Sequence, residues 1–530
     1  MENTQSLTKP HDPFSLRKID AYLEKYYKTL WMALRHHKTH KNQHLTMAGH
    51  QYMKAILMDK TKHIVVMKST QCGISECLIV LVIGETINGR SVFYVLPTYD
   101  IMGRFVSNRF EKSLAYTPYY KQFTKGGVTK KSDNKTLKDI GKGVISFAGS
   151  NTPVPFTEFP ADTYVIDEKD QCHQDHIKMG KERLGHADDP RMIEVSNPTI
   201  TDFAIDEAYA MSDKKLWSMR CSRCNEFIFP SFFDHVVREV EDQVYILRDK
   251  TFDKETGQSL LAICDKCERP FDRYSDGEWV YQQRSAISGY QISKIFSGKI
   301  PLSDLVFNFN RGLVNDFEMQ RFYNSDLGLP FVQAGAKLTT NLLNSCIRNY
   351  NAPMFSDKKC VMGVDVGAVL HVRINEILEG DQRRAVFIGT VNELEDLFLL
   401  VKQYNVVCAV IDALPETRLA KTFAHSFKGG FRCFFGTAKR DILTPKEKTV
   451  TVDRTQLLDT VKEEFILEKI YLPGNASSID SYYDQMTAST RIYDEAKEMY
   501  RWEEGSKADH YFLTEGYCSL AFKLLKLITK

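Results

Sequence analysis

Residues 63–75, HIVVMKSTQCGIS, restrict the fold of this chain more than any other stretch, because they predict a buried strand that runs into a phosphate-binding loop. The Walker A pattern is G-x-x-x-x-G-K-[ST], and here Gly73 and Ser75 stand at the second glycine and the hydroxyl. Ile74 takes the usual lysine position, and Lys68 brings the positive charge from the strand end. Backbone N–H groups, an ammonium and a hydroxyl are what a nucleotide triphosphate with Mg²⁺ needs. The alternative is an ordinary loop; the predicted ATP-binding residues are Lys68, Ser69, Thr70, Gln71, Cys72, Gly73, Ile74 and Ser75.

A second strand with functional side chains is predicted in residues 162–170, DTYVIDEKD. Asp167 and Glu168 follow a short apolar run, and parallel α/β sheets bind ligands at the carboxyl ends of their strands. A P-loop ATPase needs one carboxylate near Mg²⁺ and another residue to position the attacking water. We therefore expect Asp167 to serve the metal and Glu168 the water, the alternative being a solvated acidic turn.

Two further features fit a nucleotide site. The strand Met192–Val195 ends in a polar tip that could sense the γ-phosphate and pass the signal onward, through Ser196, Asn197 and Thr199. Gln51 could hydrogen-bond adenine, although an exposed helix glutamine is an equally good interpretation.

Composition places the chain in a broad class. Its 530 residues suggest two to four domains, and 70 Lys+Arg balance 68 Asp+Glu, so total charge neither indicates nor excludes a nucleic-acid partner. The longest apolar run is too short to span a bilayer, and the polar N-terminus has no secretory core. We expect a soluble intracellular protein with reduced cysteines and no membrane partner.

Four of the twelve cysteines form two C-x-x-C pairs. Each pair can place two thiolates on one Zn²⁺, and a predicted β-ribbon lies between the pairs. With no open ligand position the site should be structural; its predicted ligands are Cys221, Cys224, Cys264 and Cys267.

The last third of the chain predicts a second chemistry. A strand carrying Asp365 is followed by a hairpin, a helix and another strand that ends at Asp412, which is the element order of an RNase H-like nuclease. In that fold the two aspartates lie side by side, and paired Mg²⁺ or Mn²⁺ ions between such carboxylates cleave phosphodiesters. Asp509, with its neighbour His510, is the expected third ligand, although it could be a helix N-cap; Glu515 is a weaker alternative.

The predicted fold class is α/β: a P-loop ATPase domain with a zinc-ribbon insertion, followed by an RNase H-like nuclease domain. The predicted boundaries are a helical lead-in over residues 1–50, the ATPase core over 51–205, the zinc-ribbon insertion with a linker or lid over 206–350, and the nuclease over 351–530.

The motifs KSTQCGIS, TYVIDEKD, SNPT, CSRC with CDKC, GVDVG, VIDA and DHYFLTEGY occur here in the order that resembles the large terminase subunit of tailed bacteriophages. The resemblance extends from about Gln51 to Leu524 and implies a viral packaging motor, which uses ATP to move double-stranded DNA into a procapsid. It also implies a metal-dependent endonuclease that cuts concatemeric DNA with Asp365, Asp412 and Asp509, and coupling of hydrolysis to movement by residues 196–199.

The same resemblance implies the partners and the place of action. Double-stranded DNA, a portal protein and a small terminase subunit would be partners, and the motor would be a homo-oligomer, often a pentamer. It would act in the host cytoplasm, bound to the procapsid only during packaging and missing from the mature virion.

The chain departs from the family pattern in two places. Many members end the third nuclease motif in D-H-x-x-D, whereas Leu513 occupies the last position here. No arginine finger is evident, so Arg104 and Arg109 are only candidates. Candidate DNA contacts are the lysine-rich segment 121–142, for which a solvated loop is a slightly better interpretation, and the basic loop residues Lys439, Arg440, Lys446 and Lys448.

Two rival functions remain open from the sequence. One is a helicase-like DNA translocase whose RNase H-like end is not catalytic, and the other is a non-enzymatic assembly scaffold. ATP turnover with and without DNA, and metal-dependent cutting of DNA, separate them.

Overall fold

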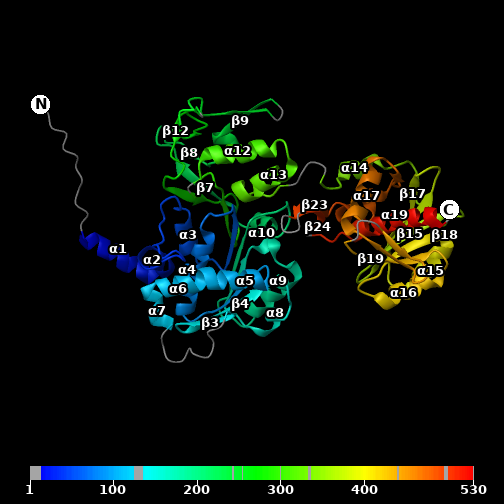
Figure 1. The fold of residues 1–530 in the computed structure, drawn as a ribbon, viewed down its shortest axis with the longest axis horizontal. Coiled ribbons are helices and arrows are strands. Elements are labelled where there is room, and N and C mark those ends of the chain that lie inside the picture. Colours follow the sequence, from blue (N-terminus) through cyan, green and yellow to red (C-terminus); the bar gives the residue numbers. More distant parts are fainter. Residues whose placement is uncertain are drawn as a thin grey trace. The chain divides into compact units, whose positions relative to one another are not determined.

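The computed structural model describes residues 13–124, 135–241, 244–253, 255–298, 300–331, 336–437, 441–494, 499–505 and 507–528. The chain divides into two compact units, Met1–Phe331 and Val332–Lys530, which are drawn in Figure 1. Among the helices of the described ranges, none has the length and apolar character that crossing a bilayer requires.

The first unit is built on a mixed sheet whose long path runs β13-β7-β14-β1-β6-β5-β2-β4-β3, with β8 paired to β7. Strands β14, β1, β6, β5, β2 and β4 are parallel to one another, so their carboxyl ends meet at one edge. The strands on the path are β1 (His63–Lys68), β2 (Ser91–Leu96), β3 (Leu137–Ile140), β4 (Gly143–Gly149), β5 (Thr163–Asp167), β6 (Arg191–Ser196), β7 (Lys215–Arg220), β13 (Gly277–Val280) and β14 (Ser288–Ile292).

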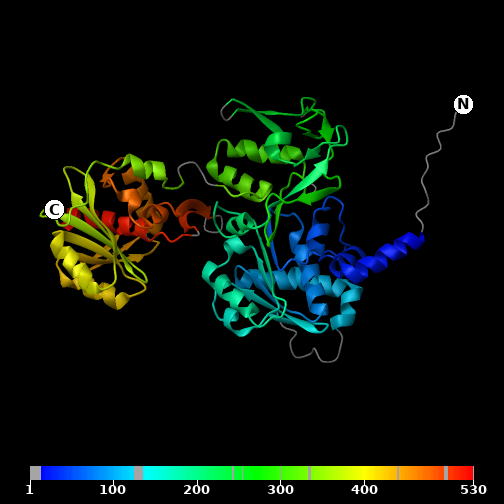
Figure 2. The same ribbon diagram turned by 180° about the vertical axis from the view of Figure 1, so that it is seen from behind.

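Helices cover both faces of this sheet (Figures 1 and 2), so its central strands are buried on both faces and mostly apolar. On β1, Ile64 and Val66 pack into the cluster that holds α4, whereas Val65 and Met67 pack against α10. The helices of this part are α1 (Pro13–Tyr26), α2 (Lys28–Arg35), α3 (Met53–Met58), α4 (Ile74–Ile87), α5 (Tyr99–Phe105), α6 (Glu111–Tyr116), α7 (Pro118–Thr124), α8 (Pro155–Glu158), α9 (Gln174–Gly180) and α10 (Ile205–Met211).

An insertion lies between β7 and β14 and carries the four paired cysteines, as the sequence predicts. Its β-ribbon is β9 (Val237–Glu241) with β10 (Val244–Leu247), an antiparallel pair. Three aromatic residues, Phe232, Phe309 and Phe322, pack together and join the insertion to the helices that follow β14. The remaining elements of this part are β8 (Phe227–Ile228), α11 (Phe232–His235), β11 (Ala262–Ile263), β12 (Pro270–Phe271), α12 (Leu302–Gly312), α13 (Asp316–Arg321) and the π-helix Phe322–Leu327.

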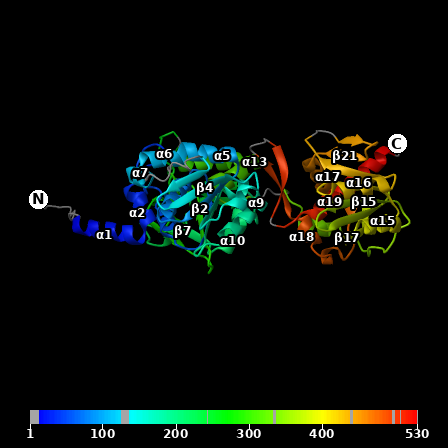
Figure 3. The ribbon, with the colours of Figure 1, turned by 90° about the horizontal axis from the view of Figure 1, so that it is seen from below.

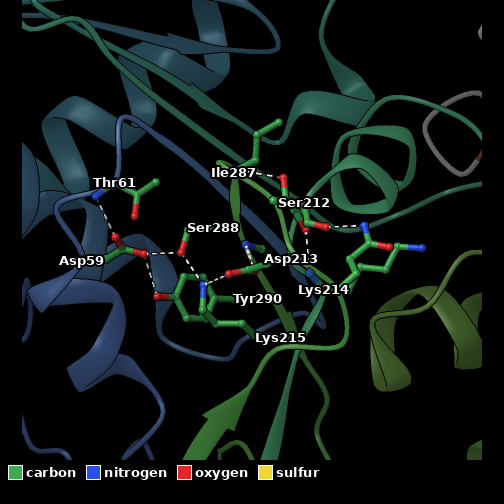
Figure 4. Close-up of polar contacts among 12 residues, drawn as sticks. Asp59, Thr61, Ser212, Asp213, Lys214, Lys215, Ile287, Ser288 and Tyr290 are labelled. Atoms are coloured by element: carbon green, nitrogen blue, oxygen red, sulfur yellow. Dashed lines mark hydrogen bonds and ion pairs between the residues drawn. The ribbon is translucent and has the colours of Figure 1, made fainter.

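A polar network joins the amino ends of neighbouring strands in this sheet (Figure 4). Asp59, just before β1, accepts hydrogen bonds from the hydroxyls of Ser288 at 2.5 Å and Tyr290 at 2.7 Å. Burial alone would raise the pKa of Asp59, but these bonds and others lower it. Lys215 reaches the same network and lies 2.5 Å from Asp213. The network therefore joins β1, β7 and β14 at the edge opposite the phosphate loop.

The second unit contains a sheet of order β20-β21-β19-β18-β15-β16-β17-β22. Strand β15 pairs antiparallel with β16 and parallel with β18, so the predicted first and fourth strands of the RNase H-like order are neighbours. The strands are β15 (Cys360–Val366), β16 (Leu370–Ile377), β17 (Arg383–Val391), β18 (Val406–Asp412), β19 (Gly430–Phe435), β20 (Ile442–Thr444), β21 (Thr449–Val452) and β22 (Ile470–Tyr471), with a separate ribbon of β23 (Ser489–Asp494) and β24 (Met499–Glu504).

Helices cover this sheet on both faces as well (Figure 3). Met362 and Val364 of β15 pack with α15 and α16, whereas Val361 packs with α19 on the other face. Gly363 allows that close approach, since a Cβ there would lie 2.2 Å from the Thr514 carbonyl oxygen. The helices are α14 (Thr340–Ser345), α15 (Leu394–Gln403), α16 (Thr417–Ser426), α17 (Arg454–Ile466), α18 (Tyr482–Met486) and α19 (His510–Ile528).

Candidate nucleotide and metal sites

The phosphate loop connects β1 to α4 at the carboxyl edge of the first sheet. Gly73 caps α4 with φ = 83°, a conformation that favours glycine, and a Cβ there would lie 3.2 Å from the His50 ring. The buried ammonium of Lys68 lies 2.9 Å from Glu168 Oε1 and donates to Asn197 Oδ1 at 3.1 Å. The displaced lysine therefore meets both the acidic strand end and the polar tip of β6.

The two acidic residues at the end of β5 differ in environment. Asp167 is buried and accepts a hydrogen bond from the Tyr94 hydroxyl at 2.8 Å. Burial, and then the charge of Glu168, raise the pKa of Asp167. Burial alone would lower the pKa of Lys68, but the carboxylates raise it above its ordinary value. A buried carboxylate and a charged lysine beside it are suited to a metal–phosphate ligand.

Glu168 has a left-handed backbone, φ = 57°, which turns the chain at the end of β5. A cavity of about 310 Å³ opens beside it and is lined by Ser75, Asp167, Glu168, Arg104 and Arg109, among others. Both arginine candidates thus lie at the cavity that contains the loop hydroxyl and the acidic pair.

Gln51 does not lie in a helix, because α3 begins at Met53. Its side-chain oxygen is buried and has no hydrogen-bond partner within the described ranges. An unpaired buried amide oxygen is costly, so it is available to a donor that a ligand would bring.

The polar tip of β6 is tied to the acidic strand by Asp170, a residue to which the sequence assigned no role. One oxygen of the Asp170 carboxylate accepts from the Thr199 backbone N–H and hydroxyl, both at 2.8 Å, and the other accepts from the Ile205 N–H at 3.0 Å. The Ser196 hydroxyl in turn accepts from the Asp170 N–H at 3.0 Å. Hydrogen bonds therefore tie both Ser196 and Thr199 to the segment that follows β5.

Residues 324–328 also belong to this site, although no sequence motif marks them. The Asn197 amide donates to the Asn324 carbonyl oxygen at 3.1 Å, and the Asn324 amide donates to the Thr199 carbonyl oxygen at 2.8 Å. The Thr70 N–H donates to the Ser325 carbonyl oxygen at 2.9 Å. This segment connects the phosphate loop with the tip of β6. The one local sequence feature that could have marked it is the glycine of NSDLG, which adopts a left-handed φ of 65°.

The four paired cysteines come together in the insertion. Their sulfur atoms lie within 4.8 Å of one another, with Cys221 and Cys267 3.8 Å apart and Cys224 and Cys264 3.9 Å apart. Four thiolates bound tetrahedrally at about 2.3 Å from Zn²⁺ would lie about 3.8 Å apart, so the set fits that ion. Backbone N–H groups donate to Cys221 and to Cys264, both at 3.4 Å, as thiolates in such turns require.

In the second unit, Asp365 and Asp412 end neighbouring strands. The parallel register pairs Val364 with Ile411, so the next residues along the two strands are the two aspartates. Burial raises the pKa of both carboxyls, and the charge of Asp365 adds to the rise at Asp412. A divalent cation between them would remove that repulsion.

Two histidines lie beside Asp365. His510 Nδ1 is 2.8 Å from Asp365 Oδ2, and its ring stacks on His371 with centroids 4.5 Å apart. Each of these side chains offers a ligand atom within 4.8 Å of the others. Burial, and then His510, lower the pKa of His371 to about 4, whereas the bond to Asp365 raises that of His510.

The other two candidate acids are differently engaged. Asp509 Oδ2 accepts from Arg454 at 2.7 Å and from the Ser489 hydroxyl at 2.6 Å. Glu515 is buried against Arg373, with Nε and Oε2 2.8 Å apart, and it also accepts from the Asn375 amide at 2.8 Å. Glu515 is thus part of the packing between β16 and α19.

The candidate DNA contacts are only partly described. Residues 125–134, Lys439 and Arg440 lie outside the described ranges. Lys446 is exposed, whereas the Lys448 ammonium donates to the Lys428 carbonyl oxygen at 3.2 Å.

Comparison with known proteins gives one family. Residues 40–279 match the family model described as phage terminase large subunit gpA, ATPase domain. Among solved structures, the HK97 bacteriophage large terminase is 8% identical, over 96% of this chain and 95% of that chain, with a TM-score of 0.48. The large terminase of a thermophilic bacteriophage is 10% identical, over 94% of this chain and 99% of that chain, with a TM-score of 0.28.

The large terminase nuclease of the thermophilic phage G20c is 13% identical, over 36% of this chain and 90% of that one, with a TM-score of 0.23. No curated protein matches the chain. The motifs at the carboxyl edge of the first sheet lie within the span that the family model matches. Residues 40–279 are therefore similar to the ATPase domain of the phage terminase large subunit gpA family.

Proposed function

We propose that this protein is the motor subunit of viral genome packaging, in which ATP hydrolysis drives double-stranded DNA into a procapsid. The observation that carries the proposal is the meeting of Lys68, Glu168 and Asn197 within hydrogen-bond distance, in a segment of the gpA ATPase family. Lys68 stands at the start of the phosphate loop, Glu168 follows β5, and Asn197 lies at the polar tip of β6. A nucleotide at this point would therefore contact all three.

The residues fit ATP with Mg²⁺. The amides of residues 71–75 and the Lys68 ammonium would hold the phosphates, since the Ser69 and Thr70 N–H groups already donate to carbonyl oxygens, and Ser75 and Asp167 would hold the ion. Glu168 would accept a proton from the attacking water once its contact with Lys68 is exchanged for the phosphates. Arg104 or Arg109, at the same cavity, would neutralise charge on the transferred phosphoryl group.

The coupling path would begin at Asn197, which bonds the lysine that senses the phosphates. Thr199 is held by Asp170, and Asn324 joins this tip to the segment beside the phosphate loop. Loss of the γ-phosphate would change the position of Lys68 and so of Asn197. Movement of residues 196–199 and 324–328 is the output we infer.

The second unit would act as a metal-dependent endonuclease that cuts concatemeric DNA. Asp365 and Asp412 would hold Mg²⁺ or Mn²⁺, with Asp509 as the third acid expected from the resemblance. The ions would supply an activated water and stabilise the leaving oxygen. Zn²⁺ held by the four cysteines would brace the insertion and take no part in the chemistry.

The partners we infer are double-stranded DNA, a portal protein, a small terminase subunit and further copies of this chain, in a pentamer on the procapsid. The protein would act in the host cytoplasm. The division into a lead-in, an ATPase core over 51–205, an insertion with a lid and a nuclease from residue 351 belongs to the same proposal.

The test of the motor is ATP turnover by Glu168→Gln beside the control Glu158→Gln, an exposed glutamate of α8. Loss of a general base costs about 10²- to 10⁴-fold, so the first variant should bind ATP but lose turnover to that extent. Near-normal turnover by Glu168→Gln would reject the assignment. For the nuclease, plasmid cleavage should disappear in Asp365→Ala while ATPase activity persists.

The same plasmid assay distinguishes the proposed motor from the rival function, a helicase-like translocase whose second unit does not cut DNA. DNA-stimulated ATP turnover without cleavage in either Mg²⁺ or Mn²⁺ would favour it.

A further inference from the structure

His371 has no role in the proposed chemistry, yet its position is unusual for a histidine without a function. It lies on β16 directly across from Asp365 of β15, so both side chains are on the sheet face that packs against α19. The residue is 7% exposed, and its Nδ1 is buried with no hydrogen-bond partner within the described ranges. A buried ring nitrogen without a partner is costly unless a ligand completes it.

On this face of the sheet, each of the remaining polar residues of β16 has a partner on α19. Glu515 bonds both Arg373 and Asn375, the two residues that follow His371 on this face. His510, one helical turn or so before Glu515, stacks on His371 and contacts Asp365. The stacked rings bring nitrogen atoms to Asp365 but leave His371 Nδ1 unsatisfied.

The three side chains have the spacing of ligands on one ion. Their ligand atoms lie within 4.8 Å of one another, and Asp365 Oδ2 is 2.8 Å from His510 Nδ1. Two neighbouring ligands of an octahedral ion with bonds of about 2.1 Å lie about 3.0 Å apart. A cation bound to both atoms would replace their hydrogen bond and lie to one side of the line that joins them, so the distance between the two atoms would change little.

Asp509 is less available as a metal ligand than Asp365. Its Oδ2 accepts two hydrogen bonds, from Arg454 and Ser489, and the guanidinium neutralises its charge. A cation at Asp509 would have to displace or oppose that guanidinium. The adjacent His510 meets no such competitor, since its contact is the carboxylate of Asp365 itself.

We propose that Asp365, His371 and His510 bind one divalent transition-metal ion, at a site that prefers Mn²⁺ to Mg²⁺. This inference rests on the proposed nuclease function and changes its ligand set. Imidazole nitrogen binds first-row transition-metal ions, of which Mn²⁺ is the weakest binder, more readily than it binds Mg²⁺, so two histidine ligands favour Mn²⁺ over Mg²⁺. Asp412 ends the neighbouring strand beside Asp365 but does not belong to this cluster of three. Asp509 is a positioning residue that fixes the start of α19.

The test uses MnCl₂ and the full chain without nucleotide, in an Asp167→Asn background that weakens Mn²⁺ binding at the ATPase site. Electron spin-echo measurements detect ¹⁴N nuclei bound to Mn²⁺, and titration gives the affinity. The variants are Asp365→Ala, His371→Phe, which keeps a ring against His510 and Tyr511, and His510→Gln. The matched control is His425→Gln, an exposed histidine on α16 of the same unit.

We expect ¹⁴N modulation on Mn²⁺ that each histidine variant reduces, together with affinity at least about tenfold weaker. The Asp365→Ala variant should lose the bound ion, and His425→Gln should match the parent. Absence of ¹⁴N modulation in the parent, or unchanged affinity in both histidine variants, would overturn the inference. Thermal unfolding by circular dichroism confirms that each variant is folded before it is counted.

Plasmid cleavage separates this inference from the nuclease proposal. Equal cutting in Mg²⁺ and Mn²⁺ that both histidine variants retain would refute the histidine ligands and leave the nuclease intact. Histidine-bound Mn²⁺ with no cutting under either ion would reject the nuclease and leave the metal site.

Discussion

The ion pair between Arg373 and Glu515 gives a sharp test of what holds the nuclease-like unit together. Both side chains are 1% exposed, and the charged atoms are 2.8 Å apart between β16 and α19. In Glu515→Gln the guanidinium of Arg373 stays buried without its counter-charge. Removing one partner of a buried pair costs about 3–5 kcal/mol, because the remaining charge has lost its compensation.

Hydrogen exchange measured by mass spectrometry reports this loss of stability peptide by peptide. Each 1.4 kcal/mol is about tenfold in an opening equilibrium, so amides of β16 and α19 that exchange through unfolding of the unit should speed up by about two to four orders of magnitude. Peptides from β1 and β6, in the other unit, serve as the internal reference. Glu379→Gln, an exposed glutamate in the same unit, is the matched control.

The double variant Arg373→Leu with Glu515→Leu should recover part of the loss, since apolar replacements of a buried pair are often tolerated. Asn375 keeps it from full recovery, because its amide loses Glu515 as an acceptor. Exchange in Glu515→Gln within about threefold of the parent would refute the claim that this charge pair is essential to the packing.

Three further predictions concern stability and metal content. Gly363→Ala should destabilise the second unit by about 1–3 kcal/mol, because the new Cβ would lie 2.2 Å from the Thr514 carbonyl oxygen, and its unfolding midpoint should fall. Gly367→Ala is the control, since its Cβ would have no atom nearer than 3.5 Å, and an equal loss of stability in both variants would contradict the prediction. Burial opposes the charge of Glu194, but His63 and Lys169 lower its pKa from 4.5 to about 2, so its stabilisation is present above pH 4.5 and is lost as pH falls toward 2. The stability gap between the parent and Glu194→Gln should therefore narrow over that range in urea titrations, and a constant gap would disprove the charge argument. Cys264→Ser should lose most of the bound zinc measured by elemental analysis, whereas Cys346→Ser, a buried thiol that donates to the Phe465 carbonyl oxygen, should keep it; equal zinc in both would exclude the four-cysteine site.

The amino-acid sequence was sufficient for the local features of this protein. Strands β1, β5 and β6 could be predicted because each is a mostly apolar run that ends in a polar residue; these residues are Lys68, Asp167 and Ser196. The C-x-x-C spacing predicts each knuckle, since both thiolates of a pair lie on one tight turn. The hairpin after Asp365 and the strand before Asp412 follow from alternation and from buried runs in the same way.

Only the tertiary structure decided which side chains meet. His510 and Asp365 are 145 positions apart, and Lys68 and Asn197 are 129 apart, so no local pattern relates them. The segment 324–328 reaches the phosphate loop through backbone groups, which leave no trace in residue type. Asp509 and Glu515 look alike as acids near the start of one helix, yet one faces Arg454 and the other Arg373. Their different partners depend on how α17, β16 and α19 pack, which is a property of the whole unit, whereas sequence patterns record only what each short segment prefers.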